Sequence, residues 1–283
     1  MKVAAIQLSS TADRAANMAV ADRLTRAAAA DGASLIVLPE KWTAMGAEAD
    51  LRAAAEPLDG PSVEWACALA GELGVDLVAG SILEVLPGRE KLANTSVHVD
   101  PEGRVRAVYR KIHMFDVDIA GRSYRESELE EPGSEIVLSE TRDGVQLGMS
   151  ICYDLRFPEL FRILAVKGAR VVVMPAAFTL QTTGDHWETL VRARAIENQV
   201  FMVAANQVGA HPAGQHSGGR SMIVDPWGVV LAEAPGSGEQ PGGSEGYVTA
   251  ELDLERQQEI RCNLPSLANR RPSAYAWPEE VRA

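Results

Sequence analysis

The chain of 283 residues is 46% hydrophobic and 23% charged, which is enough to bury a sizeable core as one large domain over residues 1–283. Its formal net charge of -12 at pH 7 argues against nucleic acid and an anionic membrane surface as partners, although a local basic pocket could still bind an anionic substrate. No apolar run approaches the roughly 20 residues that a membrane-spanning helix needs.

Cysteine usage and the N-terminus both indicate a cytoplasmic protein. The three cysteines, Cys67, Cys152 and Cys262, are odd in number and lack the spacing of metal ligands, which is typical of a reducing compartment. The N-terminal sequence MKVAAIQLSS contains no signal-peptide cleavage pattern. The five histidines form neither an HxH nor an HExxH pattern, so we expect no metal site and no cofactor.

Strands and helices alternate along the first half of the sequence. Apolar runs predict strands at residues 3–7, 33–40, 76–83, 95–99 and 104–109, and apolar periodicity predicts helices at residues 11–31, 50–55 and 61–73. A turn at residues 101–103 predicts a hairpin that leads into the strand before Lys111. Residues 116–133 have the character of a long charged loop, and loops of this length in compact domains are usually functional.

The alternation continues in the second half. Strands are expected at residues 146–151, 170–175, 200–208 and 247–252, a hairpin at residues 221–233, and helices from Pro158 onward, at residues 186–198 with Asp185 as N-cap, and at residues 253–261. Two glycine-rich loops are expected at residues 209–219, where His211 and His216 should be exposed, and at residues 235–246. Because the composition does not change between the halves, the sequence predicts one α/β fold, a four-layer α-β-β-α sandwich.

Cys152 lies where a buried strand is expected to turn into a helix. Pro158 suits the first turn of that helix, because its φ is preset and the N–H it lacks would be unpaired there. A cysteine on such a turn has the geometry of a nucleophile elbow, and the positive end of the helix would favour a thiolate. A free cysteine is more often a small buried hydrophobe, so its position alone does not make Cys152 catalytic.

Two other predicted strands end in reactive side chains. Glu40 ends the second strand, and Lys111 follows the strand at residues 104–109. Taken singly, each has an ordinary explanation as a solvated carboxylate or a surface charge. In α/β folds, however, ligands bind outside the carboxyl ends of the strands, where Glu40, Lys111 and Cys152 would meet.

Three motifs in order carry a family resemblance. LIVLPE ends in Glu40, YRKIHMFDVD contains Lys111, and GMSICYDLRFPEL contains Cys152. With these motifs the chain resembles the nitrilase, or carbon–nitrogen hydrolase, superfamily, whose catalytic set is Glu–Lys–Cys in that chain order. The similarity extends from Val3 to Tyr275 and implies the four-layer α-β-β-α sandwich of the nitrilase type.

The resemblance implies a mechanism in which water hydrolyses a small-molecule amide. Cys152 would attack the carbonyl carbon and form a thioester, while Glu40 would take the thiol proton and later activate water. Lys111 would stabilise the oxyanion, helped by a backbone N–H near Tyr153. By the same resemblance Glu126 would position the lysine and the substrate.

The resemblance defines Glu126 and the substrate-binding residues less closely than it defines the three catalytic residues. Glu128 and Glu130 lie close to Glu126 and remain alternatives to it. His113 resembles a family position near the pocket, where it would pack or form a hydrogen bond. Phe178, in the matching VVVMPAAF segment, is a further candidate substrate-binding residue.

The segment CYDLRFPEL is most similar to the Nit branch of the superfamily. That branch includes the ω-amidases, which act on 2-oxoglutaramate and 2-oxosuccinamate, and deaminated-glutathione amidase. These substrates carry carboxylates, which Arg156, Arg122 or Arg125 would bind as a bidentate partner. A structural ion pair with Asp154 or Glu159 is an equally good explanation of Arg156.

Other functions remain open. Within the superfamily, an N-carbamoyl-amine or nitrile hydrolase would use the same residues. A glutaminase module that feeds ammonia to a synthetase would need a separate partner, and a non-catalytic scaffold would not need the complete Glu40–Lys111–Cys152 set. We expect a homodimer or higher homo-oligomer, paired through residues 161–166 and the tail at residues 275–277.

Overall fold

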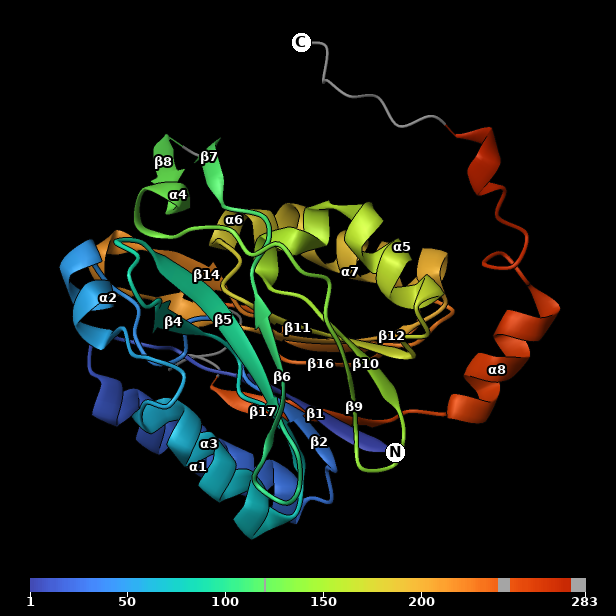
Figure 1. The fold of residues 1–283 in the computed structure, drawn as a ribbon, viewed down its shortest axis with the longest axis horizontal. Coiled ribbons are helices and arrows are strands. Elements are labelled where there is room, and N and C mark those ends of the chain that lie inside the picture. The colour runs from blue at the N-terminus through green and yellow to red at the C-terminus, as the bar shows by residue number, and fades with distance from the viewer. Residues whose placement is uncertain (120, 239–244, 276–283) are drawn as a thin grey trace.

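The computed structural model describes residues 1–119, 121–238 and 245–275, and within them two β-sheets lie face to face (Figure 1). The first sheet has seven strands in the order β17-β1-β2-β3-β5-β4, with β6 beside β5. Its strands are β1 (Lys2–Gln7), β2 (Leu35–Val37), β3 (Asp76–Val78), β4 (Ile82–Val85), β5 (Leu92–Val99), β6 (Val105–Arg110) and β17 (Gly246–Glu251).

The second sheet has six strands within the described residues, in the order β16-β15-β12-β11-β10-β9. They are β9 (Leu138–Glu140), β10 (Gln146–Met149), β11 (Val171–Ala176), β12 (Phe201–Asn206), β15 (Met222–Val224) and β16 (Val230–Glu233). Both sheets are mixed, with a parallel centre of β1-β2-β3 in the first and β10-β11-β12 in the second.

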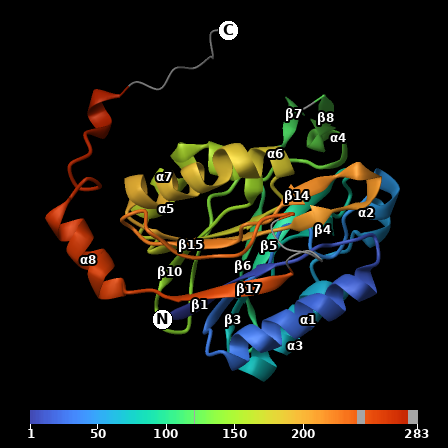
Figure 2. The ribbon, with the colours of Figure 1, turned by 180° about the vertical axis from the view of Figure 1, so that it is seen from behind.

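Helices cover the outer face of each sheet. α1 (Arg14–Ala30) and α3 (Pro61–Leu73) cover the first sheet, and α5 (Pro158–Val166) and α7 (Glu188–Asn198) cover the second (Figure 2). The four-layer α-β-β-α sandwich is therefore confirmed. No helix within the described residues is long and apolar enough to cross a membrane.

Alternation along the strands explains why both faces of each sheet are buried. Val3 and Ala5 of β1 pack into the core between the sheets, whereas Ala4 and Ile6 pack against α1 and α3. A strand buried on both faces needs apolar residues at successive positions, not only at alternate ones. This is why the strands appear in the sequence as short continuous apolar runs.

Two predictions, the strand at residues 76–83 and the N-cap Asp185, differ from the structure. The strand expected at residues 76–83 is interrupted, because Gly80 has φ +55° and a Cβ there would collide with the Pro39 carbonyl oxygen. Asp185 is not an N-cap: the chain is already helical from α6 (Leu180–Thr182), which Thr179 caps, and continues as a π-helix over Thr183–Trp187 into α7.

The predicted loop at residues 116–133 has its own structure. It contains the hairpin β7 (Asp116–Ile119) and β8 (Arg122–Arg125), followed by α4 (Glu126–Leu129). A second small hairpin joins β13 (Val208–Ala210) to β14 (His216–Gly218), and Arg122 donates a hydrogen bond to the Gly214 carbonyl between them. Residues 239–244 of the second expected glycine-rich loop lie outside the described residues.

Candidate active site

The three residues singled out by the motifs follow strands of both sheets and meet in one cavity. Glu40 comes three residues after β2, Lys111 directly after β6, and Cys152 three residues after β10. All three line a cavity of about 320 Å³. The side chains of Glu40 and Lys111 are almost completely buried, with exposed fractions of 3% and 1%. Neither is therefore a solvated surface charge.

Cys152 sits on a strained turn. Its φ is +46°, a left-handed conformation that is uncommon for residues other than glycine and often marks functional sites. Asp154 holds the turn: its carboxylate accepts hydrogen bonds from the Ile151 N–H at 2.8 Å and the Tyr109 hydroxyl at 2.6 Å. The elbow is thus anchored by a fully buried carboxylate two residues beyond the thiol.

Burial raises the pKa of the Cys152 thiol well above its usual value, and the negative charge of Glu40 raises it further. The expectation that a helix N-terminus favours the thiolate is wrong for the free enzyme. The effects of burial and of Glu40 dominate, and a 3-10 turn over Cys152–Arg156 also separates the thiol from α5, which begins only at Pro158. A helix dipole acts within about one turn of the helix end.

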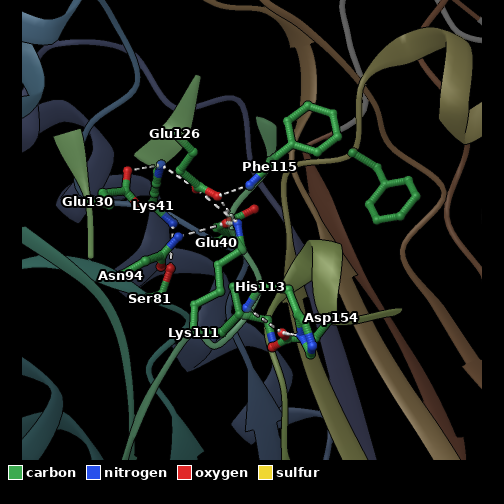
Figure 3. Close-up of polar contacts among 12 residues, drawn as sticks. Glu40, Lys41, Ser81, Asn94, Lys111, His113, Phe115, Glu126, Glu130 and Asp154 are labelled. Carbon is green, nitrogen blue, oxygen red and sulfur yellow. Dashed lines mark hydrogen bonds and ion pairs between the residues drawn. The ribbon is translucent and has the colours of Figure 1, made fainter. Parts of the chain in front are cut away.

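Lys111 lies between two carboxylates (Figure 3). Its Nζ donates to Glu40 Oε1 at 2.9 Å and to Glu126 Oε2 at 2.7 Å. Burial lowers the pKa of Lys111, but the charges of Glu126 and Glu40 outweigh it and hold the pKa well above its usual value. Lys111 is therefore a fixed ammonium at neutral pH. Of the three glutamates considered for the second position, Glu126 is the one that contacts it.

Two residues of this cluster, Asn94 and Lys41, were missed from the sequence. Asn94 on β5 donates to Glu40 Oε1 at 2.8 Å, and Lys41 pairs with both Glu126 and Glu130. Asn94 could have been noticed as a polar residue in a strand that is buried throughout. Lys41 stands directly beside Glu40 in the sequence, but nothing in its pattern indicates burial.

The remaining predicted residues, which were expected to support catalysis or bind substrate, divide into two groups. Tyr153, Arg156 and Phe178 line the cavity. The Arg156 guanidinium lies over the Phe178 ring at 5.5 Å and over the Tyr153 ring at 5.9 Å. In the described part of the chain it makes no ion pair with Asp154 or Glu159, so the alternative explanation of Arg156 as an ion-pair partner is not supported.

Other predicted residues either do not line the cavity or have a charge that is already paired with another protein group. His113 stacks on Phe157 and bonds Asp154 through Nδ1 at 2.7 Å, so it supports the elbow and does not line the cavity. Arg122 bonds the opposite hairpin, and Arg125 lines the cavity but pairs with Asp118 at 2.9 Å.

Of the two loop histidines, only His216 is exposed as predicted. His211 is buried, with one ring nitrogen 2.8 Å from the Ser10 carbonyl oxygen and the other 2.9 Å from Ser217 Oγ. Within the described residues, no group of three or more His, Cys, Asp or Glu is arranged to hold a metal ion.

The outer wall of the cavity is built from short segments outside the two large sheets. Leu51 comes from α2 (Glu48–Ala54), Tyr124 from β8 and Leu129 from α4, while Gln215 and His216 come from the β13–β14 hairpin. The reactive side chains thus stand on the sheets, and the surroundings of a bound molecule are provided by the loops.

Comparison with known proteins agrees with this geometry. The family model described as carbon-nitrogen hydrolase matches residues 2–262. The chain belongs to the carbon-nitrogen hydrolase family. This carbon-nitrogen hydrolase is 37% identical over 270 residues to the deaminated glutathione amidase of Synechocystis, covering 94% of this chain and 97% of that protein. It is 36% identical over 276 residues to the omega-amidase NIT2 of Homo sapiens, covering 97% and 96% of the two chains.

A solved structure extends the comparison to the fold of this hydrolase. The NitFhit protein of C. elegans superimposes with a TM-score of 0.87 at 35% sequence identity. The match covers 97% of the present chain but 66% of the worm protein. The fold is accordingly that of the nitrilase superfamily, and the chain has relatives in its Nit branch.

Proposed function

We propose that this carbon–nitrogen hydrolase is a thiol-dependent amidase that cleaves a small carboxylate-bearing amide to the acid and ammonia. The observation that carries the proposal is the buried contact of 2.9 Å between Lys111 and Glu40 in the cavity that Cys152 also lines. The amidase names of the relatives support the same reaction class. The substrate would be an ω-amido 2-oxo acid or deaminated glutathione.

The reaction would proceed through a thioester on Cys152. The thiol transfers its proton to Glu40 as sulfur attacks the amide carbonyl carbon, and the oxyanion that forms is stabilised by Lys111. Collapse of the tetrahedral intermediate breaks the C–N bond, and ammonia leaves with the proton from Glu40. Water then attacks the thioester while Glu40 accepts its proton, which releases the acid and restores the thiol.

Glu40 would act in both halves of this cycle. Its Oε1 is held by Lys111 and Asn94, so the carboxylate has a fixed orientation before substrate binds. Because the thiol is neutral in the free enzyme, its proton is available to the base when substrate arrives. Glu126 would keep the Lys111 ammonium in position, and the Tyr153 backbone N–H is proposed as a second oxyanion donor.

Arg156 is our proposed anchor for the substrate carboxylate. Its guanidinium lies against two aromatic rings in the cavity and contacts His186 Nδ1 at 3.4 Å, but it has no carboxylate partner in the described residues, so its charge is available to a ligand. An arginine binds a carboxylate through two parallel hydrogen bonds. We propose that a short dicarboxylate monoamide binds with its carboxylate at Arg156 and its amide at Cys152, because both residues line the cavity.

The test is ammonia release from a panel of five compounds: 2-oxoglutaramate, deaminated glutathione, glutamine, an N-carbamoyl amino acid and a simple nitrile. We expect turnover of one of the first two. Turnover of the nitrile or the N-carbamoyl compound alone would contradict the proposed substrate class. No turnover of any compound, with Cys152 unreactive to alkylation, would favour a non-catalytic scaffold.

Replacing Arg156 should impair binding of carboxylate-bearing amides selectively. We expect Arg156→Met to raise KM for 2-oxoglutaramate about 10- to 100-fold, because charge-assisted hydrogen bonds contribute about 1.5–3 kcal/mol. Steady-state kinetics on 2-oxoglutaramate and on an uncharged amide of similar length would measure this. The comparison variant is Arg125→Met, whose charge is already used by Asp118. Equal losses on both amides would contradict the assignment.

We further propose that residues 1–283 form one catalytic domain, that the protein acts in the cytoplasm and that it assembles as a homo-oligomer. Cys67, Cys152 and Cys262 are all unpaired, which suits a reducing compartment. Ile163 and Val166 of α5 are exposed apolar side chains on the proposed contact face, as is Tyr275 in the tail. Residues 276–283, which include Trp277, lie outside the described residues.

A further inference from the structure

A second lysine is buried beside the Glu40–Lys111–Cys152 set. Lys41 follows Glu40 directly and has φ +49°, and the Ser81 hydroxyl accepts its backbone N–H at 3.0 Å. Its ammonium donates to Glu126 Oε1 at 3.0 Å and forms a second ion pair with Glu130 (Figure 3). All three ionic groups line the cavity.

Glu126 is held from two sides by these lysines. Its Oε1 accepts from both Lys41 and Lys111, at 3.0 and 2.9 Å, and its Oε2 accepts from Lys111 and from the Phe115 N–H. Burial would raise the pKa of this carboxyl, but Lys111 and then Lys41 hold it well below its usual range. The orientation and charge of Glu126 therefore depend on Lys41 as well as on Lys111.

The charged groups that face Lys41 are Glu126, Glu130, Glu40 and Lys111. Glu130 differs from the other two carboxylates, because its Oε2 is buried and has no hydrogen-bond partner in the described residues. Burial is the main cause that raises the pKa of Glu130, to about 8, and the charge of Lys41 opposes this rise. Glu130 aside, Glu40 and Glu126 carry two negative charges against the single positive charge of Lys111, and the Lys41 ammonium provides the second positive charge.

We propose that Lys41 is a positioning residue for the proposed amidase reaction: together with Lys111 it holds Glu126 in place, and it cancels one excess negative charge of the buried cluster. An uncompensated negative charge would oppose the thiolate and the oxyanion, both of which add negative charge beside the same buried ionic groups. Lys41 thus acts on the chemical step through Glu126 and Lys111, without touching the substrate carbonyl.

The test compares Lys41→Met, Lys41→Arg and the double variant Lys41→Met/Glu130→Leu with the wild type. We expect Lys41→Met to lower kcat about 10- to 100-fold, as removal of the partner of a catalytic group typically does, and to change KM by less than about threefold. Lys41→Arg keeps the charge and should recover most of the activity. Lys167→Met removes an exposed lysine after α5 and is the matched control.

The double variant distinguishes a positioning role of Lys41 from the cost of leaving Glu130 buried without its ion-pair partner. It removes Glu130 together with its ion-pair partner, so it should fold as stably as the wild type while keeping the kcat loss of Lys41→Met. If the double variant instead recovers wild-type kcat, Lys41 serves only to neutralise Glu130, and the proposal is wrong. A kcat for Lys41→Met within about twofold of wild type would also overturn it.

A second readout does not depend on the substrate. The rate at which iodoacetamide alkylates Cys152 reports thiolate formation, and we expect it to fall in Lys41→Met and to recover in Lys41→Arg. The inference about Lys41 rests on the proposed function, and the alkylation measurement allows the two to be tested separately. If the wild type hydrolyses no amide, the proposed function fails, and equal alkylation rates in the wild type and Lys41→Met would independently overturn the role of Lys41.

Discussion

Amide hydrolysis should disappear when Cys152 is replaced with alanine, with kcat reduced by about 10⁴-fold or more. Without sulfur no thioester can form, and the buried carboxylate has no nucleophile from which to take a proton. The fold should persist, because the substitution removes one atom from a side chain at the cavity wall. Ammonia release, read together with the melting temperature, would measure both effects.

The control for Cys152 uses the other two cysteines. Cys67 is half-buried and Cys262 is exposed, and neither lines the cavity. A Cys67→Ala/Cys262→Ala double variant should keep wild-type kcat and should be acylated once per chain in a mass spectrum taken during turnover. Substantial amide hydrolysis by Cys152→Ala would rule out the thioester route.

Glu40→Gln is expected to lower kcat about 10²- to 10⁴-fold, the usual contribution of a general base. Glutamine preserves the volume and the acceptor oxygen for Asn94 and Lys111, so the loss reports the missing proton acceptor. The pH dependence provides a second signature. Burial keeps the thiol pKa high, so the residual rate should rise about tenfold per pH unit above neutrality as thiolate forms without a base.

A buried carboxylate elsewhere provides the matched control for Glu40. Glu56 is also buried and ion-paired, with Arg14, but does not line the cavity. Glu56→Gln should affect the melting temperature more than kcat. A residual rate of Glu40→Gln that does not change with pH would contradict the role of Glu40 as the base.

The order of strands and helices could largely be predicted because the buried strands appear in the sequence as continuous apolar runs. Continuous apolar runs such as residues 171–176 can be buried on both faces, and the proline at position 158 marks the start of α5. The hairpin at residues 116–125 could not be predicted in this way. Its strands have four residues each and are mostly exposed: Val117 and Ile119 of β7 are only half-buried, and the ion pair between Arg125 and Asp118 spans the two strands.

The position of the site could be predicted because the ends of several strands converge there. The ionisation states of its residues could not be predicted. Glu40, Lys111 and Cys152 could be proposed as a set from their positions after strands. The ionisation of Cys152 depends on burial and on the distance to α5, which the sequence does not specify. Lys41 became evident only in three dimensions, since its partner Glu126 is 85 residues away. Tertiary contacts of this kind leave no local pattern.

The reactive side chains follow strands of the two sheets, whereas the outer cavity wall comes from short loops and hairpins. This division has a consequence for engineering. Tyr124, Gln215 and His216 line the cavity from short hairpins, whereas the apolar cores lie between the sheets and beneath the helices. Randomised libraries at these three wall positions should therefore yield mostly folded variants. Selection from such libraries could redirect the enzyme toward amides of other shapes while the reaction chemistry is kept intact.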